Sequence, residues 1–230
     1  MVGHIRRYWI RWSLGALLLA ILAVTAVPYA YTTYIAAAAP AGLATERSQP
    51  DTEGPAAPLD GRWVAADGSE AEYRIDEILF GQEITAVGRT GEVDGEIEIA
   101  GTAVSTGRVD VDMASVATDN ARRDRQFRDN LMDVSANPTA TFALTAPVEL
   151  PHAPAVGEEL TVPARGELTL RGVTRPVTVD LTVRRGSVEL TVSGEVPVTL
   201  SDYAIPRPSI AGITVSEQAA VGFALRFEPA

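Results

Sequence analysis

The sequence has no cysteine and only two histidines among its 230 residues. Without cysteine, no disulfide can stabilise the fold and no thiol can act as a nucleophile. Only His152 lies beyond the N-terminal 36 residues, too few histidines for the usual zinc, haem or Ser-His-Asp sites. A metal would need carboxylates alone, and the acidic pairs Glu96/Glu98 and Asp110/Asp112 have the two-residue spacing of a solvent-facing strand surface. We therefore expect no metal, no cofactor and no enzymatic activity.

The sequence also contains no lysine, and its charge is divided unevenly between 19 arginines and 30 acidic residues. All 30 acidic residues and 16 of the arginines follow residue 45, so this part carries a net charge of −14 and the first 45 residues carry +3. A strongly acidic folded part argues against nucleic acid and against general attraction to anionic lipid surfaces.

The N-terminal region contains the one long uncharged run. Arg6, Arg7 and Arg11 precede residues 12–45, whose most apolar part is 14–27. Residues 12–35 are long enough to cross a bilayer, and the preceding arginines predict a cytoplasmic N-terminus. We expect residues 1–36 to be a cytoplasmic tail and transmembrane helix that anchors the protein in the cell membrane. The alternative is a signal peptide cleaved at the Ala-x-Ala pattern in 36–39, which would give a secreted protein.

Residues 37–60 are rich in Ala, Pro, Gly, Ser and Glu without periodicity, which predicts a disordered tether. Residues 61–230 then alternate apolar and polar positions in short segments joined by turn residues. This pattern predicts an all-β, antiparallel sandwich or barrel. The expected strands are 72–79, 83–90, 92–106 with a break near Gly101, 108–116, 139–144, 159–170, 175–184, 187–200 with a break near Gly194, and 216–227. Gly172 interrupts the alternation and predicts a turn or sharp bend between 159–170 and 175–184.

One segment, 118–132, departs from strand periodicity and predicts a short helix with Thr118 or Asp119 as N-cap. Its arginines are suited to a phosphate or carboxylate head group, or they pair with neighbouring acidic residues on a surface helix. The head-group candidates are Arg122, Arg123, Arg125 and Arg128.

The apolar positions of the strands face the interior of the predicted barrel. An eight-stranded barrel either fills its interior with side chains or holds one small ligand, and the residues alone leave both alternatives open. The candidate ligand-lining residues are Val109, Val111, Phe142, Leu144, Leu168, Leu170, Val179, Leu181, Val192, Phe223 and Leu225.

Three motifs stand in order along the chain: Arg123-Asp124, Pro-Thr-Ala-Thr-Phe at 138–142, and Gly-Glu-Leu-Thr-Leu-Arg-Gly-Val-Thr-Arg-Pro-Val-Thr-Val at 166–179. In this order and spacing the chain resembles the YceI-like family of lipid- or polyisoprenoid-binding proteins, over residues 60–228. The resemblance implies a lipocalin-like antiparallel β-barrel whose apolar tunnel holds a long isoprenoid or similar lipid. It also implies export, a frequent link to stress responses, and no catalytic apparatus. The Pro-Arg-Pro segment at 206–208 departs from the family pattern and is expected to reshape one mouth of the barrel.

The favoured hypothesis is a tethered extracytoplasmic barrel that binds or transports a hydrophobic lipid, an isoprenoid or a quinone-like molecule. The alternative is a non-catalytic envelope interaction or structural module that uses its outer surface, including residues 206–208. A third hypothesis, an isomerase or cyclase acting on a bound lipid, requires an ionisable group inside the tunnel. Asp76, within the first predicted strand, is the first candidate for that group.

Overall fold

The structure is a computed structural model that describes residues 40–43, 56–79, 81–208 and 213–230. The predicted membrane anchor at 1–36 lies outside the described residues. Within the described ranges, no helix combines the length and hydrophobicity needed to cross a membrane.

Strands dominate the described part of the chain, and all of their pairings are antiparallel. The strands are β1 (Gly61–Ala65), β2 (Glu70–Leu79), β3 (Gln82–Thr90), β4 (Val93–Ala100), β5 (Ala103–Asp112), β6 (Thr139–Leu144), β7 (Val148–Glu149), β8 (Glu159–Leu170), β9 (Val173–Arg185), β10 (Leu190–Thr199) and β11 (Ile213–Pro229). The helical segments are α2 (Ala121–Gln126), the π-helical turn η2 (Phe127–Leu131) and the 3₁₀ turn η3 (Leu200–Tyr203).

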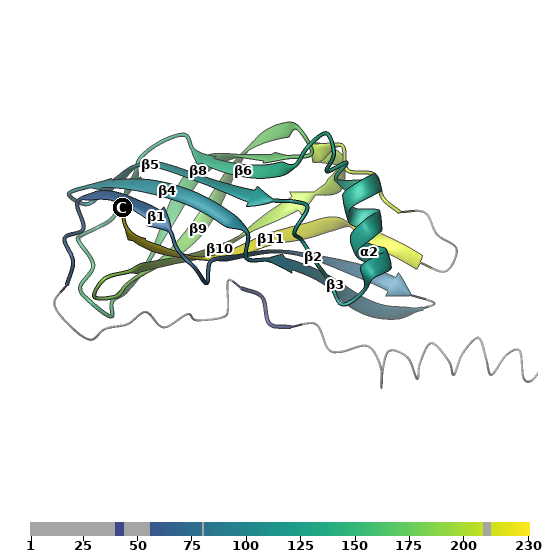
Figure 1. The fold of residues 1–230 in the computed structure, drawn as a ribbon, viewed down its shortest axis with the longest axis horizontal. Coiled ribbons are helices and arrows are strands. Elements are labelled where there is room, and N and C mark those ends of the chain that lie inside the picture. Colours follow the sequence, from purple (N-terminus) through teal and green to yellow (C-terminus); the bar gives the residue numbers. More distant parts are fainter. Residues whose placement is uncertain (1–39, 44–55, 80, 209–212) are drawn as a thin grey trace, which may run out of the picture.

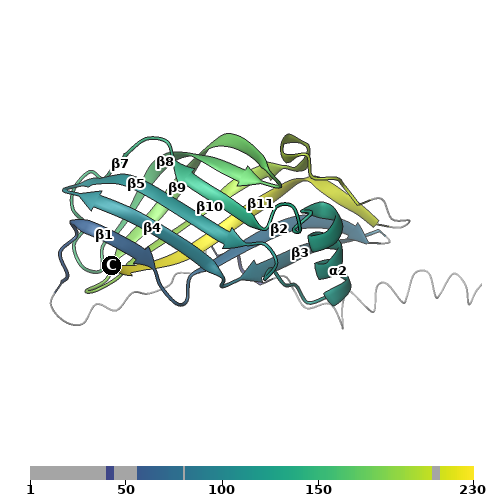
Figure 2. The same cartoon turned by 45° about the horizontal axis from the view of Figure 1, so that its top comes forward.

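A ring of eight strands closes because β11 pairs with β1 as well as with β10. The ring runs β1-β4-β5-β6-β8-β9-β10-β11 and returns to β1. The long strand β11 changes partner along its length: Phe227 lies opposite Ala65 in β1, and Ala224 lies opposite Glu70 in β2. The β2–β3 hairpin therefore extends one end of the barrel, and α2 lies at that end (Figures 1 and 2). The predicted antiparallel barrel with one short helix is confirmed.

The β8–β9 hairpin shows how local sequence determines this architecture. A two-residue turn joins the strands, with φ of 49° at Arg171 and 72° at Gly172. Positive φ at both central residues matches the right-handed twist of hairpin strands, and glycine adopts it without steric cost. The turn predicted at Gly172 is confirmed, and β8 has the predicted bounds.

Several predicted boundaries differ from the structure. The strand β10 runs through Gly194 without a break, and β5 runs continuously through Gly107 from Ala103. The strand β1, which closes the ring, was not predicted as a strand. Five residues are too few for a periodic pattern to stand out, and the pairing of β1 with β4 and β11 defines it.

The helix begins one residue later than expected. Asn120 is the N-cap, and its side chain accepts hydrogen bonds from the backbone N–H groups of Arg122 and Arg123. The prediction of Thr118 or Asp119 as N-cap was wrong. Both the backbone N–H and the hydroxyl of Thr118 donate to Asp124 instead, at 2.9 and 2.6 Å. This contact ties the preceding loop to the helix.

Candidate functional site

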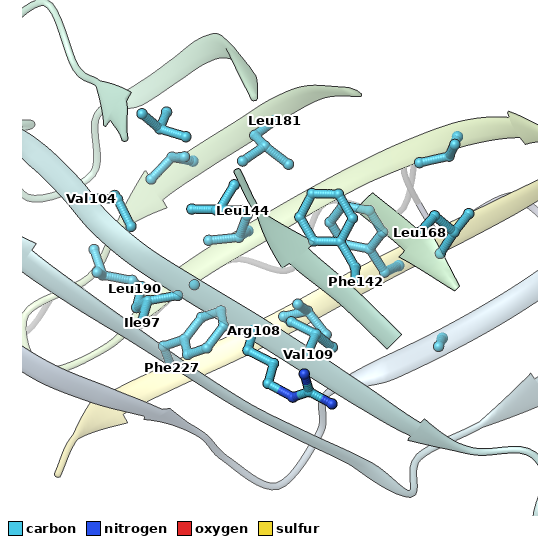
Figure 3. Close-up of a pocket in the computed structure, with 18 of the residues that line it drawn as sticks. Ile97, Val104, Arg108, Val109, Phe142, Leu144, Leu168, Leu181, Leu190 and Phe227 are labelled. Atoms are coloured by element: carbon cyan, nitrogen blue, oxygen red, sulfur yellow. The ribbon is translucent and has the colours of Figure 1, made fainter. Parts of the chain in front are cut away.

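The barrel contains two adjacent, mainly apolar compartments. The β1-end compartment is bordered by Ile99, Leu190 and Phe227 among others, and has a cavity volume of about 130 Å³. The α2-end compartment lies under α2 and η2 and has a cavity volume of about 150 Å³. The two share the lining residues Ala71, Val111, Ala140, Leu170 and Val221, so they lie next to each other along the barrel interior. Figure 3 shows part of the β1-end compartment, with side chains contributed by several strands.

Ten of the eleven predicted apolar positions border the β1-end compartment, and two of these, Val111 and Leu170, border both compartments. The exception, Val179, is buried but does not border the cavity. Its Cγ2 lies 3.0 Å from where a Cβ on Gly194 would stand, so it packs against this glycine on the inward face of the sheet. The role of these residues as ligand contacts stays a prediction. The residues lining the cavity are Val109, Val111, Phe142, Leu144, Leu168, Leu170, Leu181, Val192, Phe223 and Leu225.

Glycines in the strands make the interior open. A Cβ placed on Gly194 would lie 2.7 Å from Cζ of Phe223, and one on Gly166 would lie 2.5 Å from Cζ of Phe142. Both rings therefore contact the glycine backbone directly, at a distance that a side chain at position 194 or 166 would prevent. Because the rings rest on the wall, their bulk does not fill the centre of the barrel.

The same arrangement recurs at two further glycines. A Cβ on Gly88 would lie 2.3 Å from the Tyr73 ring, and one on Gly107 would lie 2.9 Å from Cδ1 of Leu144. This role of the glycines was not predicted from the sequence. The available signal was a glycine within a strand, which marks close approach of another group.

The α2 end combines an aromatic stack with polar groups. The Tyr73 ring stacks on Phe127 of η2, with centroids 5.0 Å apart and planes at 7°. Glu77 and Arg123 border the same compartment, with Oε2 of Glu77 4.0 Å from Nη2 of Arg123. Arg123 also donates to Asp119 at 2.6 Å. This end is therefore the polar end of an otherwise apolar interior.

Of the four predicted head-group arginines, Arg123 alone borders a compartment. Arg122 and Arg125 are exposed, and Arg128 is half-buried outside the lining. The helix turns one of these side chains toward the cavity and the others away, a consequence of its 100° rotation per residue.

The suggestion that Asp76 faces the tunnel was wrong. Asp76 is exposed on the outer face of β2 and accepts a hydrogen bond from the Thr85 hydroxyl at 2.7 Å. Glu77, the next residue, shares strand parity with Tyr73 and Ile75 and borders the α2-end compartment with them. That parity was the signal available in the sequence.

Burial is the main cause of the pKa shifts of Glu77 and Tyr73 at the polar end. Burial raises the pKa of the Glu77 carboxyl; the Arg123 charge opposes this rise and Asp119 adds to it. Burial also raises the pKa of the Tyr73 hydroxyl well above its usual range. Glu77 therefore binds a proton more readily than an exposed glutamate does.

The Pro-Arg-Pro segment lies at this same end. Pro206 and Pro208 border the α2-end compartment, and Arg207 forms a 2.9 Å ion pair with Glu217. Over the described ranges, no cluster of three His, Asp or Glu residues is placed to hold a metal ion.

A family model described as the YceI-like domain matches residues 64–227. The chain belongs to the YceI-like family. The match begins in β1 and ends in β11, so it includes the eight strands of the closed ring.

Solved structures agree with this YceI-like fold. A polyisoprenoid-binding domain from Saccharophagus degradans, implicated in plant cell wall breakdown, is 21% identical with a TM-score of 0.60 and covers 74% of this chain and 99% of that one. BcnA from Burkholderia cenocepacia is 19% identical with a TM-score of 0.52 and covers 67% of this chain and 95% of that one. At these identities the likeness concerns the fold.

Curated relatives carry the name UPF0312 protein. The relative from Pseudomonas aeruginosa is 34% identical over 111 residues, 47% of this chain and 52% of that protein. The relative from Shewanella denitrificans is 33% identical over 119 residues, 50% of this chain and 58% of that protein. The matched region spans about half the length of these relatives.

Proposed function

We propose that this YceI-like barrel binds a hydrophobic long-chain lipid, a polyisoprenoid or a quinone-like molecule, in its interior, without catalysing a reaction on it. The observation that carries the proposal is the pair of adjacent, mainly apolar compartments inside the barrel. We further propose that the barrel works outside the cytoplasm, joined by residues 37–60 to a membrane anchor or released by signal cleavage.

The size and lining of the interior favour a slender chain. Each compartment is close to the roughly 150 Å³ of an apolar cavity that accepts a benzene ring. The two lie next to each other along the barrel, an arrangement that would suit a slender chain spanning both better than a fused ring system. Arg108 and Thr141 also border the β1-end compartment, but their polar groups pair with Asp110. A chain in this compartment therefore meets aliphatic and aromatic groups.

Burial of the chain supplies the binding free energy. Each methylene contributes about 0.8 kcal/mol, so one five-carbon isoprene unit contributes about 4 kcal/mol before ordering terms. A ligand of a few units then binds without specific polar contacts. This also explains why a protein with one histidine and no cysteine in the folded part can serve this function.

The polar end orients the ligand. The Arg123 guanidinium can donate to a hydroxyl, carbonyl or phosphate group, and Glu77 can donate when protonated or accept when ionised. These groups lie at the α2 end, so we place the head group there and the tail toward Phe227. The Saccharophagus degradans domain of the same fold, described as polyisoprenoid-binding, supports an isoprenoid tail.

Mass spectrometry of organic extracts tests this function directly. A chain comprising residues 40–230, which includes every described residue, is purified without detergent from a membrane-exposed source. We expect one isoprenoid or quinone-like lipid per barrel. Blank extracts, repeated after incubation with total lipid, would contradict the proposal and favour a surface interaction module.

Lipid affinity is expected to increase severalfold as the pH falls toward the raised pKa of Glu77. A bound ligand removes water from Glu77 and favours its neutral form, so binding takes up a proton and strengthens as the pH falls. The charged groups facing Glu77 are Arg123 and Asp119. Titration with a fluorescent isoprenoid at several pH values measures the effect.

The variant Glu77→Gln provides the control for this pH dependence. It keeps the shape of the side chain and cannot ionise, so its affinity should stay nearly constant over the same pH range. A pH dependence unchanged in Glu77→Gln would assign the proton uptake to another group.

A further inference from the structure

Four residues of the predicted tether lie against the barrel. Residues Pro40 to Leu43, here called the strap, contact the outer face of β2 and β3 (Figure 1). Leu43 is only 1% exposed although it lies outside the predicted barrel domain. A leucine in a segment of tether-like composition is buried only where the segment packs against a folded surface.

A buried carboxylate forms the centre of that surface. Glu72 points outward from β2, yet its side chain has no exposed area. Its Oε1 accepts the backbone N–H of Leu43 at 2.9 Å, and its Oε2 accepts Nε of Arg89 at 2.9 Å. Nη1 of Arg74 lies 3.7 Å from Oε1. A charge removed from water requires such partners, and the strap supplies one of them.

The two arginines connect the carboxylate to the strap carbonyls. Arg74 donates to the carbonyl of Pro40 at 2.8 Å, and Arg89 donates to that of Ala41. The side chains of three adjacent sheet positions therefore bind both N–H and C=O groups of the strap backbone. These contacts recognise the backbone of the strap and do not depend on its side chains.

A glycine in the sheet allows the carboxylate to lie close to the backbone. A Cβ on Gly222, opposite Glu72 in β11, would lie 3.2 Å from Oε1 of Glu72. A larger residue at 222 would therefore crowd the carboxylate, whereas a Cβ on Gly42 of the strap would lie at an ordinary contact distance of 3.4 Å from the same oxygen.

We propose that Pro40 to Leu43 is a docking strap that fixes the outer face of β2 and β3 beside the N-terminal segment of the same chain. Pro40 lies four positions after the predicted end of the anchor at residue 36, at most about 14 Å of extended chain. The barrel is therefore held close to the membrane by one defined face. Residues 44–60 of the predicted tether follow the strap, so their length does not set the distance between the anchor and the docked face.

Single cysteines test the strap without background, because the chain contains no cysteine. The full chain carrying Leu43→Cys is treated with a polar maleimide, and Val188→Cys, at a position 53% exposed, gives the reference rate. We expect Leu43→Cys to react at least about tenfold more slowly, a difference that charge-assisted hydrogen bonds can sustain. Equal rates would overturn the proposal.

A release variant, which lacks both arginines that bind the strap carbonyls, tests whether docking of the strap causes the slow labelling of Leu43→Cys. Adding Arg74→Ala and Arg89→Ala to Leu43→Cys should bring its labelling rate close to that of Val188→Cys. The matched control is Arg62→Ala, which removes an exposed ion pair with Glu96 away from the strap. A rate unchanged by the release substitutions would contradict the strap. Protection that increases with protein concentration would assign the docked segment to a second copy and overturn the intramolecular arrangement.

Hydrogen exchange on the unsubstituted full chain tests docking of the strap without any substitution that could affect folding. The Leu43 amide, which donates to the buried Glu72, should exchange at least about tenfold more slowly than in an unstructured peptide of the same sequence. Exchange at the peptide rate would rule out docking.

Discussion

Gly194→Ala is expected to reduce lipid affinity by at least about tenfold, because it places a methyl group where the Phe223 ring now lies. The added Cβ would stand 2.7 Å from Cζ of Phe223, so the ring must move away from the wall and into the interior. Phe223 borders the β1-end compartment, so this movement occupies space assigned to the ligand. Fluorescent isoprenoid titration measures the affinity, and extraction with mass spectrometry measures the lipid content.

A second substitution distinguishes occlusion from unfolding. Overpacking lowers the free energy of unfolding by about 1–3 kcal/mol, which leaves most of the domain folded if its stability is typical. Adding Phe223→Leu removes the displaced ring and should restore lipid binding to the Gly194→Ala protein. Ser193→Ala, on the opposite face of β10, is the matched control and should bind lipid normally. Unchanged binding in Gly194→Ala would show that the ligand does not pass this part of the tunnel.

Phe227→Ala is expected to lower the free energy of unfolding by about 3–5 kcal/mol. Phe227 is 1% exposed and packs in one cluster with Trp63 and Leu190. It also pairs across the ring closure, opposite Ala65 of β1 and Leu190 of β10. Its removal therefore opens a cavity at the contact that closes the barrel. Urea unfolding measures the change.

Two comparisons support this stability measurement. Val188→Ala, at an exposed position, should change the free energy of unfolding by no more than about 0.5 kcal/mol. Saturating lipid should raise the stability of both variants, because a ligand that binds only the folded state shifts the unfolding equilibrium. A loss below about 1 kcal/mol for Phe227→Ala would show that this cluster does not hold the ring closed.

Much of the barrel could be predicted because strand periodicity is local. The alternation in 159–170 predicted β8 with its observed bounds, and the glycine at 172 predicted the turn that follows. Parity alone also assigned ten apolar side chains to the interior that they border. The same rule, applied to Ile75, would have pointed to Glu77 as the inward acid, where Asp76 had been chosen.

Other features depend on contacts between segments that are distant in the chain. No local pattern distinguishes Arg123 from Arg122 or Arg125, because the side chain that faces the cavity depends on how the helix is seated on the barrel. The strap was predicted as part of a disordered tether because its four residues have no periodicity. Its burial depends on Glu72, Arg74 and Arg89, which lie 29 or more residues further along the chain.

The sequence by itself therefore determined most of the strands, the apolar side that faces inward in most of them, and membership of the YceI-like family, because these depend on spacing along the chain. Only the tertiary structure decided that β11 closes the ring through β1 and that rings rest on glycines and leave the interior open. It also decided that the polar end lies under α2. These features depend on cross-strand register and on distances between side chains, which form only when distant segments pack together.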